Sequence, residues 1–429
     1  MKHKNLIGID IGNYQLKVSL TKKGILEGFF SIPLPENLVK NSMIHFWEPM
    51  ASFLRESLAQ NNIRIKNAVF SVPLSALYIR TVELPLMTIR QLELNLPFEF
   101  HDYISDDSSE YYYDYAVIER NDQNMKLLTV ACSKKLIQQY KQLAKAARLR
   151  IVGLLPDVVG LQRVIQRYDT LYNLQGKKDY AILDMGDHAY SIHFFRHGCY
   201  EITRNLEPGA SEIVSLIAEI TEKERHVARI KAEENQDAIL EHPRLITYYE
   251  NRAVEIMRVL NFYSYSNAGN TIDTLYYCGG GSCYEKQLET IARTLTLPMR
   301  PITDLMEYGQ KEEYLKQAIL SPLSFGLALD PELNIAPVAE EAPKYEGIYT
   351  DRIHYEDSFY PNEEEEESNY DENRFSEAET EGSYGYGPID LSGIRIDTTP
   401  DPLTLLRQQD AESADSLGNG PEQNEEDTL

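Results

Sequence analysis

An apolar run near the start of the chain ends at an acid and a glycine. Residues 5–11 read Asn-Leu-Ile-Gly-Ile-Asp-Ile, Gly12 follows, and an alternating run begins near Leu16. This pattern predicts a β-hairpin whose tip can approach a phosphate, because Gly12 can adopt positive φ and the next two backbone amides can face an anion. Taken alone, it also fits an ordinary hairpin turn. The candidate binding residues are Gly12, Asn13, Tyr14 and Lys17, and Asp10 is a candidate for holding a water molecule of a Mg²⁺ shell.

A second apolar run, residues 179–185, repeats this arrangement. Asp184 lies near its end and Gly186 follows it. An alternating run with apolar side chains at positions 190, 192 and 194 comes next. Two such hairpins, about 174 residues apart, indicate a duplicated fold that holds a ligand between its halves. The candidate binding residues here are Asp184, Gly186 and Asp187, and Asp184 is a second candidate for a water-mediated Mg²⁺ contact.

A third apolar strand, residues 274–278, leads through three glycines into a helical pattern at residues 284–296. In this geometry the backbone can lie against a nucleotide while the helix N-terminus faces its negative charge. The candidate residues are Gly279, Gly280, Gly281 and Ser282. A triple glycine is also common in flexible loops, so it is the order of the three segments along the chain that favours a nucleotide site.

The segment between the two hairpins predicts a β-α-β-β-α-β unit. Residues 78–84 alternate like a strand, and Thr88 and Gln91 form a capping box for a helix that continues towards Tyr103 and bends at Pro97. Two strands (111–118 and 125–131), a helix (134–147) and a strand (149–152) complete the unit.

Charge divides the chain into two parts. The net charge is −25, and residues 331–429 hold 27 acidic and 5 basic side chains, so the remainder is nearly neutral. The acidic tail has few aliphatic residues, which predicts disorder because too little apolar surface can be buried. Its apolar islands, residues 389–396 and 401–409, are either chance or short motifs that fold on a partner. The overall charge argues against a general nucleic-acid binder, which needs clustered Lys and Arg.

Other features narrow the class of protein. With 429 residues, 42% of them hydrophobic, the chain suffices for two or three domains. The four cysteines are far apart except for one C-x4-C pair, which is typical of a reduced, cytosolic protein. No apolar stretch approaches the roughly 18–20 residues of a bilayer span, so we expect a protein that is neither exported nor membrane-spanning. No cluster of His, Cys or carboxylates has the spacing of a zinc site or a covalent catalytic triad.

The order of the three glycine segments resembles the actin-like ATPase superfamily, to which sugar kinases and heat-shock chaperones also belong. The resemblance covers about residues 5–330 and implies a bilobed α/β fold with ATP and Mg²⁺ in the cleft between the lobes. On this basis we expect a first lobe (1–77 and 151–175), an inserted subdomain (78–150), a second lobe (176–330) and a disordered acidic tail (331–429). The second lobe is expected to contain a hairpin at 180–195, a helical subdomain at 205–272 and a glycine loop at 274–283.

Several short motifs resemble the PilM family within the FtsA-like branch of this superfamily. They are Val72-Pro73, Arg80-Thr81-Val82-Glu83-Leu84-Pro85-Leu86-Met87, the acidic and aromatic residues 98–104, Asp114-Tyr115, Leu155-Pro156-Asp157-Val158 and Gly326-Leu327-Ala328-Leu329. The resemblance implies a cytoplasmic, ATP-binding scaffold of type IV pilus assembly or of a related DNA-uptake or secretion machine. Its expected partners are the cytoplasmic N-terminal peptide of a PilN-like protein, held beside the inserted subdomain, and through it the assembly complex and its motor ATPase at the inner face of the membrane. Self-association is possible within this family.

One departure from the family pattern affects the expected nucleotide site. Relatives carry Ala-Glu-x-x-Lys on a helix that contacts the ribose and base, whereas the matching residues here are Val227-Ala228-Arg229-Ile230-Lys231. Lys231 is retained as a candidate cofactor-binding residue and the glutamate is replaced by Ala228. Losing two hydrogen bonds to a charged group would cost about 1 to 3 kcal/mol, which predicts weak ATP binding and leaves slow hydrolysis an open question.

Two alternative functions remain open from the sequence. An FtsA-like division filament would need a basic amphipathic helix at its membrane end, but residues 422–429 are acidic and would be repelled by an anionic surface, which argues against direct membrane insertion. A small-molecule kinase of the same superfamily is less consistent with the sequence, because no sugar-kinase signature is present.

Overall fold

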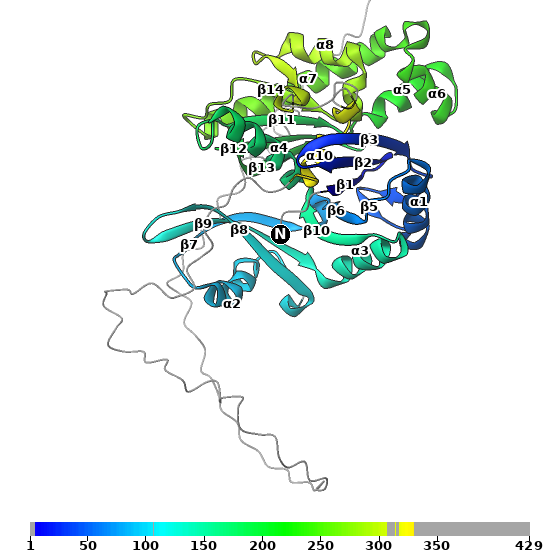
Figure 1. The fold of residues 1–429 in the computed structure, drawn as a ribbon. Coiled ribbons are helices and arrows are strands. Elements are labelled where there is room, and N and C mark those ends of the chain that lie inside the picture. The colour runs from blue at the N-terminus through cyan, green and yellow to red at the C-terminus, as the bar shows by residue number, and fades with distance from the viewer. Residues whose placement is uncertain (1–4, 106, 307–313, 315–316, 330–429) are drawn as a thin grey trace, which may run out of the picture. The chain divides into compact units, whose positions relative to one another are not determined.

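Two five-stranded sheets with the same topology form the centre of the protein (Figure 1). The computed structural model describes residues 5–105, 107–306, 314 and 317–329. The strand order is β10-β6-β1-β2-β3 in the first sheet and β15-β14-β11-β12-β13 in the second. In each sheet the central strand pairs in parallel on one side and starts an antiparallel meander on the other. The predicted duplication is therefore confirmed at the level of sheet topology.

The first sheet defines the first lobe, and helices α1 and α3 cover one of its faces. Alternate residues of the central strand, such as Ile7 and Ile9, are fully buried against these helices. The elements of this lobe are β1 (Asn5–Ile11), β2 (Gln15–Lys22), β3 (Ile25–Pro33), the small hairpin β4 (Val39–Lys40) and β5 (Met43–Ile44), α1 (Trp47–Gln60), β6 (Asn67–Val72), α3 (Lys134–Ala146) and β10 (Arg150–Pro156).

The second sheet defines the second lobe, and helices α5, α7 and α8 pack on its outer face. Its core alternates in the same way, because Leu183 faces these helices while Ile182 faces the opposite side. The elements are β11 (Tyr180–Met185), β12 (Tyr190–Arg196), β13 (Cys199–Leu206), α5 (Ser211–Thr221), α6 (Arg225–Glu233), α7 (Pro243–Ser266), β14 (Leu275–Cys278), α8 (Glu285–Thr294) and β15 (Met299–Pro301).

Helices α4 (Asp157–Tyr172) and α10 (Pro322–Leu327) join the inner faces of both sheets in one hydrophobic cluster. Glycines allow their close packing: a Cβ on Gly160 would lie 2.6 Å from the carbonyl oxygen of Leu323, and one on Gly8 of β1 would collide with that of Ser324. The Ser19 and Ser324 hydroxyls are 2.6 Å apart. The predicted second lobe ended at residue 330, but α10 packs on β1 and β2, so this boundary is wrong: the chain returns to the first lobe.

The inserted subdomain is a three-stranded antiparallel sheet, ordered β7-β9-β8, with one helix on its face. Its elements are β7 (Tyr78–Pro85), α2 (Ile89–Glu99), β8 (Tyr111–Arg120) and β9 (Asn124–Ser133). The predicted range 78–150 is too long, because α3 packs on α1 of the first lobe. Strand β10 pairs with β6 of the first sheet, which agrees with the expected first-lobe range 151–175 but removes this strand from the predicted β-α-β-β-α-β unit. Sequence alternation alone does not say which sheet a strand joins.

The capping box at the start of α2 is confirmed. Thr88 Oγ1 accepts from the Gln91 amide at 3.2 Å, and Gln91 Oε1 accepts from the Thr88 amide at 2.8 Å. The expected continuation of this helix to Tyr103 is wrong: α2 ends at Glu99, two residues after Pro97, so the proline lies in its last turn and does not bend a longer helix. A proline has no amide for the helical hydrogen bond, which favours an early end.

Short 3₁₀ turns complete the described elements: η1 (Leu74–Ala76), η2 (Ser108–Glu110), η3 (Gln236–Glu241), η4 (Gly280–Cys283) and η5 (Ile302–Leu305). Among the described residues no helix has the length and apolar character needed to cross a bilayer. The expected disordered tail, 331–429, lies outside the described residues.

Candidate functional site

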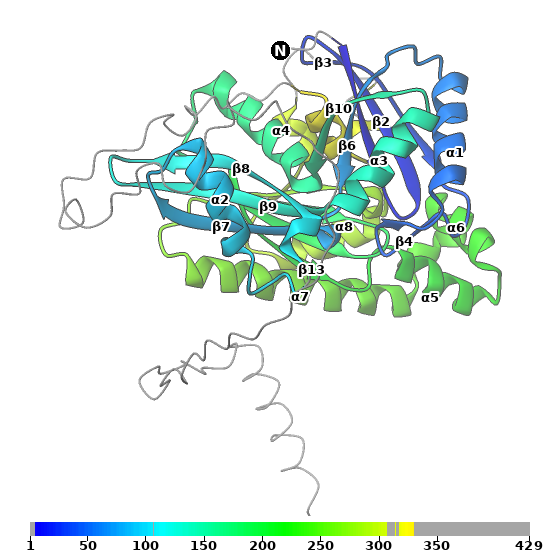
Figure 2. The same ribbon diagram turned by 90° about the horizontal axis from the view of Figure 1, so that it is seen from below.

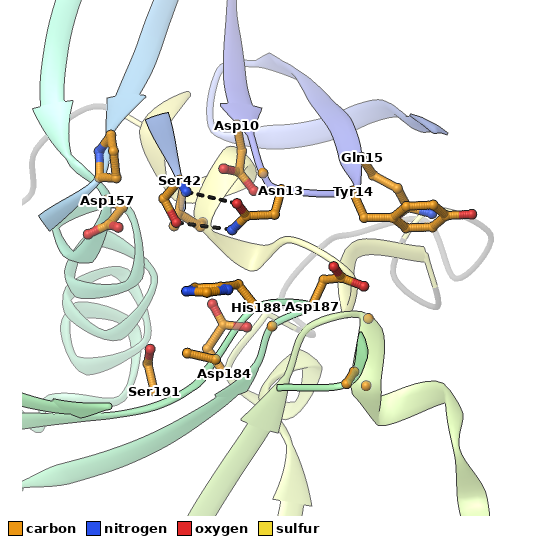
Figure 3. Close-up of a pocket in the computed structure, with 18 of the residues that line it drawn as sticks. Asp10, Asn13, Tyr14, Gln15, Ser42, Asp157, Asp184, Asp187, His188 and Ser191 are labelled. Carbon is orange, nitrogen blue, oxygen red and sulfur yellow. Dashed lines mark hydrogen bonds between the residues drawn. The ribbon is translucent and has the colours of Figure 1, made fainter. Parts of the chain in front are cut away.

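A pocket of about 800 Å³ lies where the hairpin turns of the two sheets face each other (Figure 3). Parallel strands β1 and β6 and parallel strands β11 and β14 all end here, so their carboxyl-terminal side chains converge. The structure brings most of the predicted site residues to its lining: Asp10, Gly12, Asn13, Tyr14, Lys17, Asp184, Gly186, Asp187, Gly280 and Gly281.

Lys17 and Asp10 form an ion pair at the base of the pocket. They are directly opposite in the β1–β2 register, and Lys17 Nζ lies 3.3 Å from Asp10 Oδ2. Ser321, just before α10, donates its hydroxyl to the same carboxylate oxygen at 3.0 Å. Burial lowers the pKa of Lys17, but the carboxylates of Asp10 and Asp184 outweigh it and leave the pKa raised, so the ammonium group stays charged. The floor is thus tied to the first sheet and to the returning helix.

Two further buried carboxylates face the same space from other directions. Figure 3 shows Asp10 at the top of the pocket, Asp157 at one side and Asp184 below. Burial, with the nearby charges of Asp10 and Asp184, raises the pKa of Asp157 to about 7, although amide hydrogen bonds from Val158 and Leu74 act in the opposite direction. Burial is also the main cause of the raised pKa of Asp184.

The pocket floor therefore favours a cation bound together with an anion. Three carboxylates and one ammonium group give it a negative charge when the acids are ionised, and this would repel a free phosphate. The described residues include no group of three His, Cys, Asp or Glu side chains arranged to hold a metal directly. Magnesium commonly keeps several waters and binds through one or two carboxylates plus substrate phosphates, a coordination that these residues can supply.

The glycine loop after β14 forms one wall of the pocket. A Cβ on Gly280 would meet no protein atom within 4 Å, so the space beside this residue is open and a ligand can approach the backbone closely. Gly279 lies behind the wall with φ of +89°, and a Cβ there would collide with the Asp184 carboxylate. Ser282 is buried and donates its hydroxyl to the Gly279 carbonyl oxygen at 2.6 Å. Gly279 and Ser282, both predicted to bind cofactor, shape the loop but do not line the pocket.

A contact between the lobes lies at the mouth of the pocket. The Arg229 guanidinium carbon on α6 is 3.8 Å from the ring centroid of Tyr14 in the β1–β2 turn. The same side chain donates to Asp187 Oδ1 at 3.1 Å. Arg229 and Glu233, one helical turn apart, present the face of α6 that lines the pocket.

The prediction for Lys231 is not met. Its ammonium group pairs with Asp237 at 2.7 Å and is not among the lining residues, while Ala228 is fully buried in the core. The face of α6 that lines the pocket carries Arg229 and Glu233 and not Lys231. The signal that could have found Arg229 and Glu233 is their i, i+4 spacing on the polar side of this helix.

Several lining residues were not predicted, and one of them, Ser42, is held by the predicted residue Asn13. Asn13 holds the β4–β5 turn, because its side-chain amide donates to Ser42 Oγ at 3.0 Å and its carbonyl oxygen accepts from the Ser42 amide at 2.8 Å (Figure 3). Asp157 belongs to the motif Leu155-Pro156-Asp157-Val158, whose resemblance to the family implies no binding role for it. The unpredicted lining residues that carry polar side chains include Ser42, Ser71, Asp157, His188, Ser191, Arg229 and Glu233.

A second, smaller cavity of about 190 Å³ lies where the inserted sheet meets the first lobe; we call it the junction pocket. It is lined by Val72, Leu77, Tyr112, Tyr113, Asp114, Val130, Cys132, Ile137, Tyr140, Leu154 and Pro156. Its lining is mainly apolar, and Tyr112 is about half exposed at 51%. The cavity is lined by β8, β9, α3 and the first lobe, and no residue of α2 is among its lining residues.

Comparison with known proteins identifies the family. A family model described as type IV pilus assembly protein PilM matches residues 8–330. The fold is similar to that of the solved PilM-PilN type IV pilus biogenesis complex, with 19% identity and a TM-score of 0.64 over 75% of this chain and 97% of that chain. The ethanolamine utilization protein EutJ from Carboxydothermus hydrogenoformans also matches, with 14% identity and a TM-score of 0.49 over 76% and 91% of the respective chains. The predicted actin-like α/β fold is confirmed. Because the family model spans most of its length, the chain belongs to the type IV pilus assembly protein PilM family.

Proposed function

We propose that this protein is a cytoplasmic scaffold of type IV pilus assembly that binds Mg-ATP between its lobes and a PilN-like peptide at the junction pocket. The observation that carries the nucleotide part is the convergence of both hairpin turns and the Gly280 loop on one pocket with Lys17 at its base. Family membership supports this function over an FtsA-like filament or a small-molecule kinase.

The residues of the pocket divide the work of holding a nucleotide. Lys17 would offer its charge to the phosphates, and Asp10 and Asp184 would hold waters of the Mg²⁺ shell. Gly280 would let the ligand approach the backbone. Arg229 and Glu233 would lie at the mouth of the pocket. Magnesium would supply charge neutralisation between the phosphates and the carboxylates. No covalent step is required, so any hydrolysis would rely on positioning.

Titration calorimetry tests the nucleotide part. Because the pocket floor is acidic, we expect Mg-ATP to bind at least about tenfold more tightly than ATP in the presence of EDTA, a difference of about 1.4 kcal/mol. Equal affinities would contradict the proposed role of the carboxylates, and no binding of either form would remove ATP from the proposal.

The junction pocket supports the peptide part of the proposal. An exposed aromatic beside a small apolar cavity is a typical anchor point for a peptide, because the ring loses little entropy on binding. Tyr112 meets this description, and Lys134 holds its ring with the ammonium group 5.4 Å from the centroid. In the solved PilM-PilN type IV pilus biogenesis complex, PilM is found with PilN, which makes a PilN-like N-terminal tail the peptide to test.

A matched pair of tyrosine variants tests the peptide site. Tyr112→Ala should weaken binding of a fluorescent PilN-like tail peptide at least about tenfold, as expected for an interface anchor. Tyr265→Ala, on α7 of the second lobe and 92% exposed, should bind normally. If both variants bind as tightly as the unaltered chain, the peptide site lies elsewhere. Since neither residue lines the nucleotide pocket, this result is independent of the ATP measurement.

A further inference from the structure

Three long segments of this acidic protein combine the absence of any acidic residue with at least three lysines or arginines. They are residues 11–26, 57–82 and 123–156, and each carries several lysines or arginines. Elsewhere the chain is rich in Asp and Glu, which number 67 in total. The uneven distribution of charge along the chain suggests that these segments share a surface.

The fold brings parts of all three segments to one edge of the first sheet. Strands β1, β6 and β10 are parallel, so their first residues lie at the same edge, where the Arg150 amide donates to the Lys66 carbonyl oxygen at 2.7 Å. Lys22 pairs with Asn5, the first residue of β1, so the β2–β3 turn lies there too. Helices α1 and α3 pack together on the face of the first lobe that Figure 2 shows. Helix α1 ends before β6 begins, and α3 ends before β10 begins, so the ends of both helices lie near this edge.

We define the basic edge by its seven exposed cationic residues: Lys22, Lys23, Arg64, Lys66, Lys145, Arg148 and Arg150. The ion pairs of the described residues include none of the seven. Their charges are therefore available to an external partner. The side chain of Ile25, next to Lys23 in the same turn region, is 38% exposed and adds an apolar contact point.

We propose that the basic edge docks on anionic phospholipid headgroups at a membrane surface. A bilayer surface suits a face of this kind, because the seven cationic residues extend across a five-stranded sheet, roughly 19 Å at about 4.8 Å per strand spacing. Lysine and arginine near such a surface attract acidic lipids, and an exposed aliphatic side chain adds interfacial contact. This contact is peripheral and involves no inserted helix.

Docking in this way would fix the orientation of the protein. The mouth of the nucleotide pocket lies at the carboxyl ends of β1 and β6, which is the opposite edge of the same sheet. The pocket would then face away from the lipid and stay open to the aqueous phase. The inference does not depend on whether ATP binds.

Vesicle sedimentation of the full chain tests the proposal. The chain has a net charge of −25, so attraction to an anionic vesicle requires a localised basic face and cannot arise from overall charge. We expect it to pellet with phosphatidylcholine vesicles that contain phosphatidylglycerol at low salt, and not with phosphatidylcholine alone. High salt should release it, because exposed charges are screened.

Two triple variants of equal charge separate the basic edge from general electrostatics. Lys66→Gln/Arg148→Gln/Arg150→Gln should lower the vesicle partition coefficient at least about tenfold. Lys223→Gln/Arg258→Gln/Arg293→Gln, which removes exposed charges from the second lobe, should leave it within about twofold of the unaltered chain. Equal losses in the two variants would overturn the assignment to this edge. Absence of binding to anionic vesicles at low salt would overturn the lipid proposal and leave an acidic protein as the occupant.

Discussion

Substitution of Gly280 by valine separates ligand binding from folding at the nucleotide pocket. The residue belongs to η4 and its φ is not in the left-handed region, so a side chain causes no backbone strain there. A Cβ at this position meets no protein atom within 4 Å, which means that the added methyl groups enter the pocket and not the core. The protein should therefore fold normally while the space for a nucleotide is reduced.

The expected loss follows from where the methyl groups lie. If the nucleotide approaches the backbone at this residue, Gly280→Val must displace it or force it away from the wall, and we expect Mg-ATP affinity to fall at least about tenfold, or 1.4 kcal/mol. Gly280→Ala adds one methyl group and should show a smaller loss in the same direction. Titration calorimetry measures both affinities, and thermal unfolding without ligand should give melting temperatures close to that of the unaltered chain.

Gly279→Val provides the contrasting control. At φ of +89° a valine is strained by about 1 to 3 kcal/mol, and its Cβ would collide with Asp184, so this variant should lose stability. Unchanged Mg-ATP affinity in a folded Gly280→Val protein would refute the assignment of nucleotide to this wall.

Two further predictions concern charged residues of the same pocket. Arg229→Ala should lower the free energy of unfolding in urea by about 1 kcal/mol, because it removes the stacking on Tyr14 and the partly buried pair with Asp187. Arg229→Lys should restore only part of this free energy. Equal stability of all three proteins would contradict an energetic role for the contact. The pKa of Asp157 is raised from 3.8 to about 7 in the folded protein, so between these values the folded state binds more protons than the unfolded state and stability falls as pH rises. The stability of Asp157→Asn relative to the unaltered chain should therefore increase as the pH rises from about 5 to about 8, by on the order of 1 kcal/mol or more. Parallel curves of stability against pH for the two proteins would contradict the raised pKa.

The hairpins and the glycine loop could be predicted because their signals are local. An apolar run followed by a turn glycine specifies a strand and its reversal within about ten residues, whatever the rest of the chain does. The capping box of Thr88 and Gln91 is equally local, and it was found where predicted. Residues of the turns, including Lys17 and Asp184, were therefore placed in the pocket correctly.

Features that depend on distant contacts were not predictable in the same way. The pocket-facing side of α6 is set by how the helix packs on the second sheet, which buries Ala228 and turns Lys231 away. The pKa of Asp157 is raised by its burial and by the carboxylates of Asp10 and Asp184, which are distant from it in the sequence. Likewise, β10 reads as an ordinary strand in the sequence, and its partner β6 lies more than 70 residues earlier.

The return of α10 to the first sheet has a consequence for biosynthesis. Ser19 and Ser324 are 305 residues apart in the chain and yet in contact. At a translation rate of about 5 to 20 residues per second, roughly 15 to 60 s separate the synthesis of Ser19 in β2 from that of Ser324 in the helix that packs on it. During that interval the apolar side chains that α10 will bury are accessible to solvent and to other nascent chains. The first lobe is thus first to be synthesised and among the last to be completed.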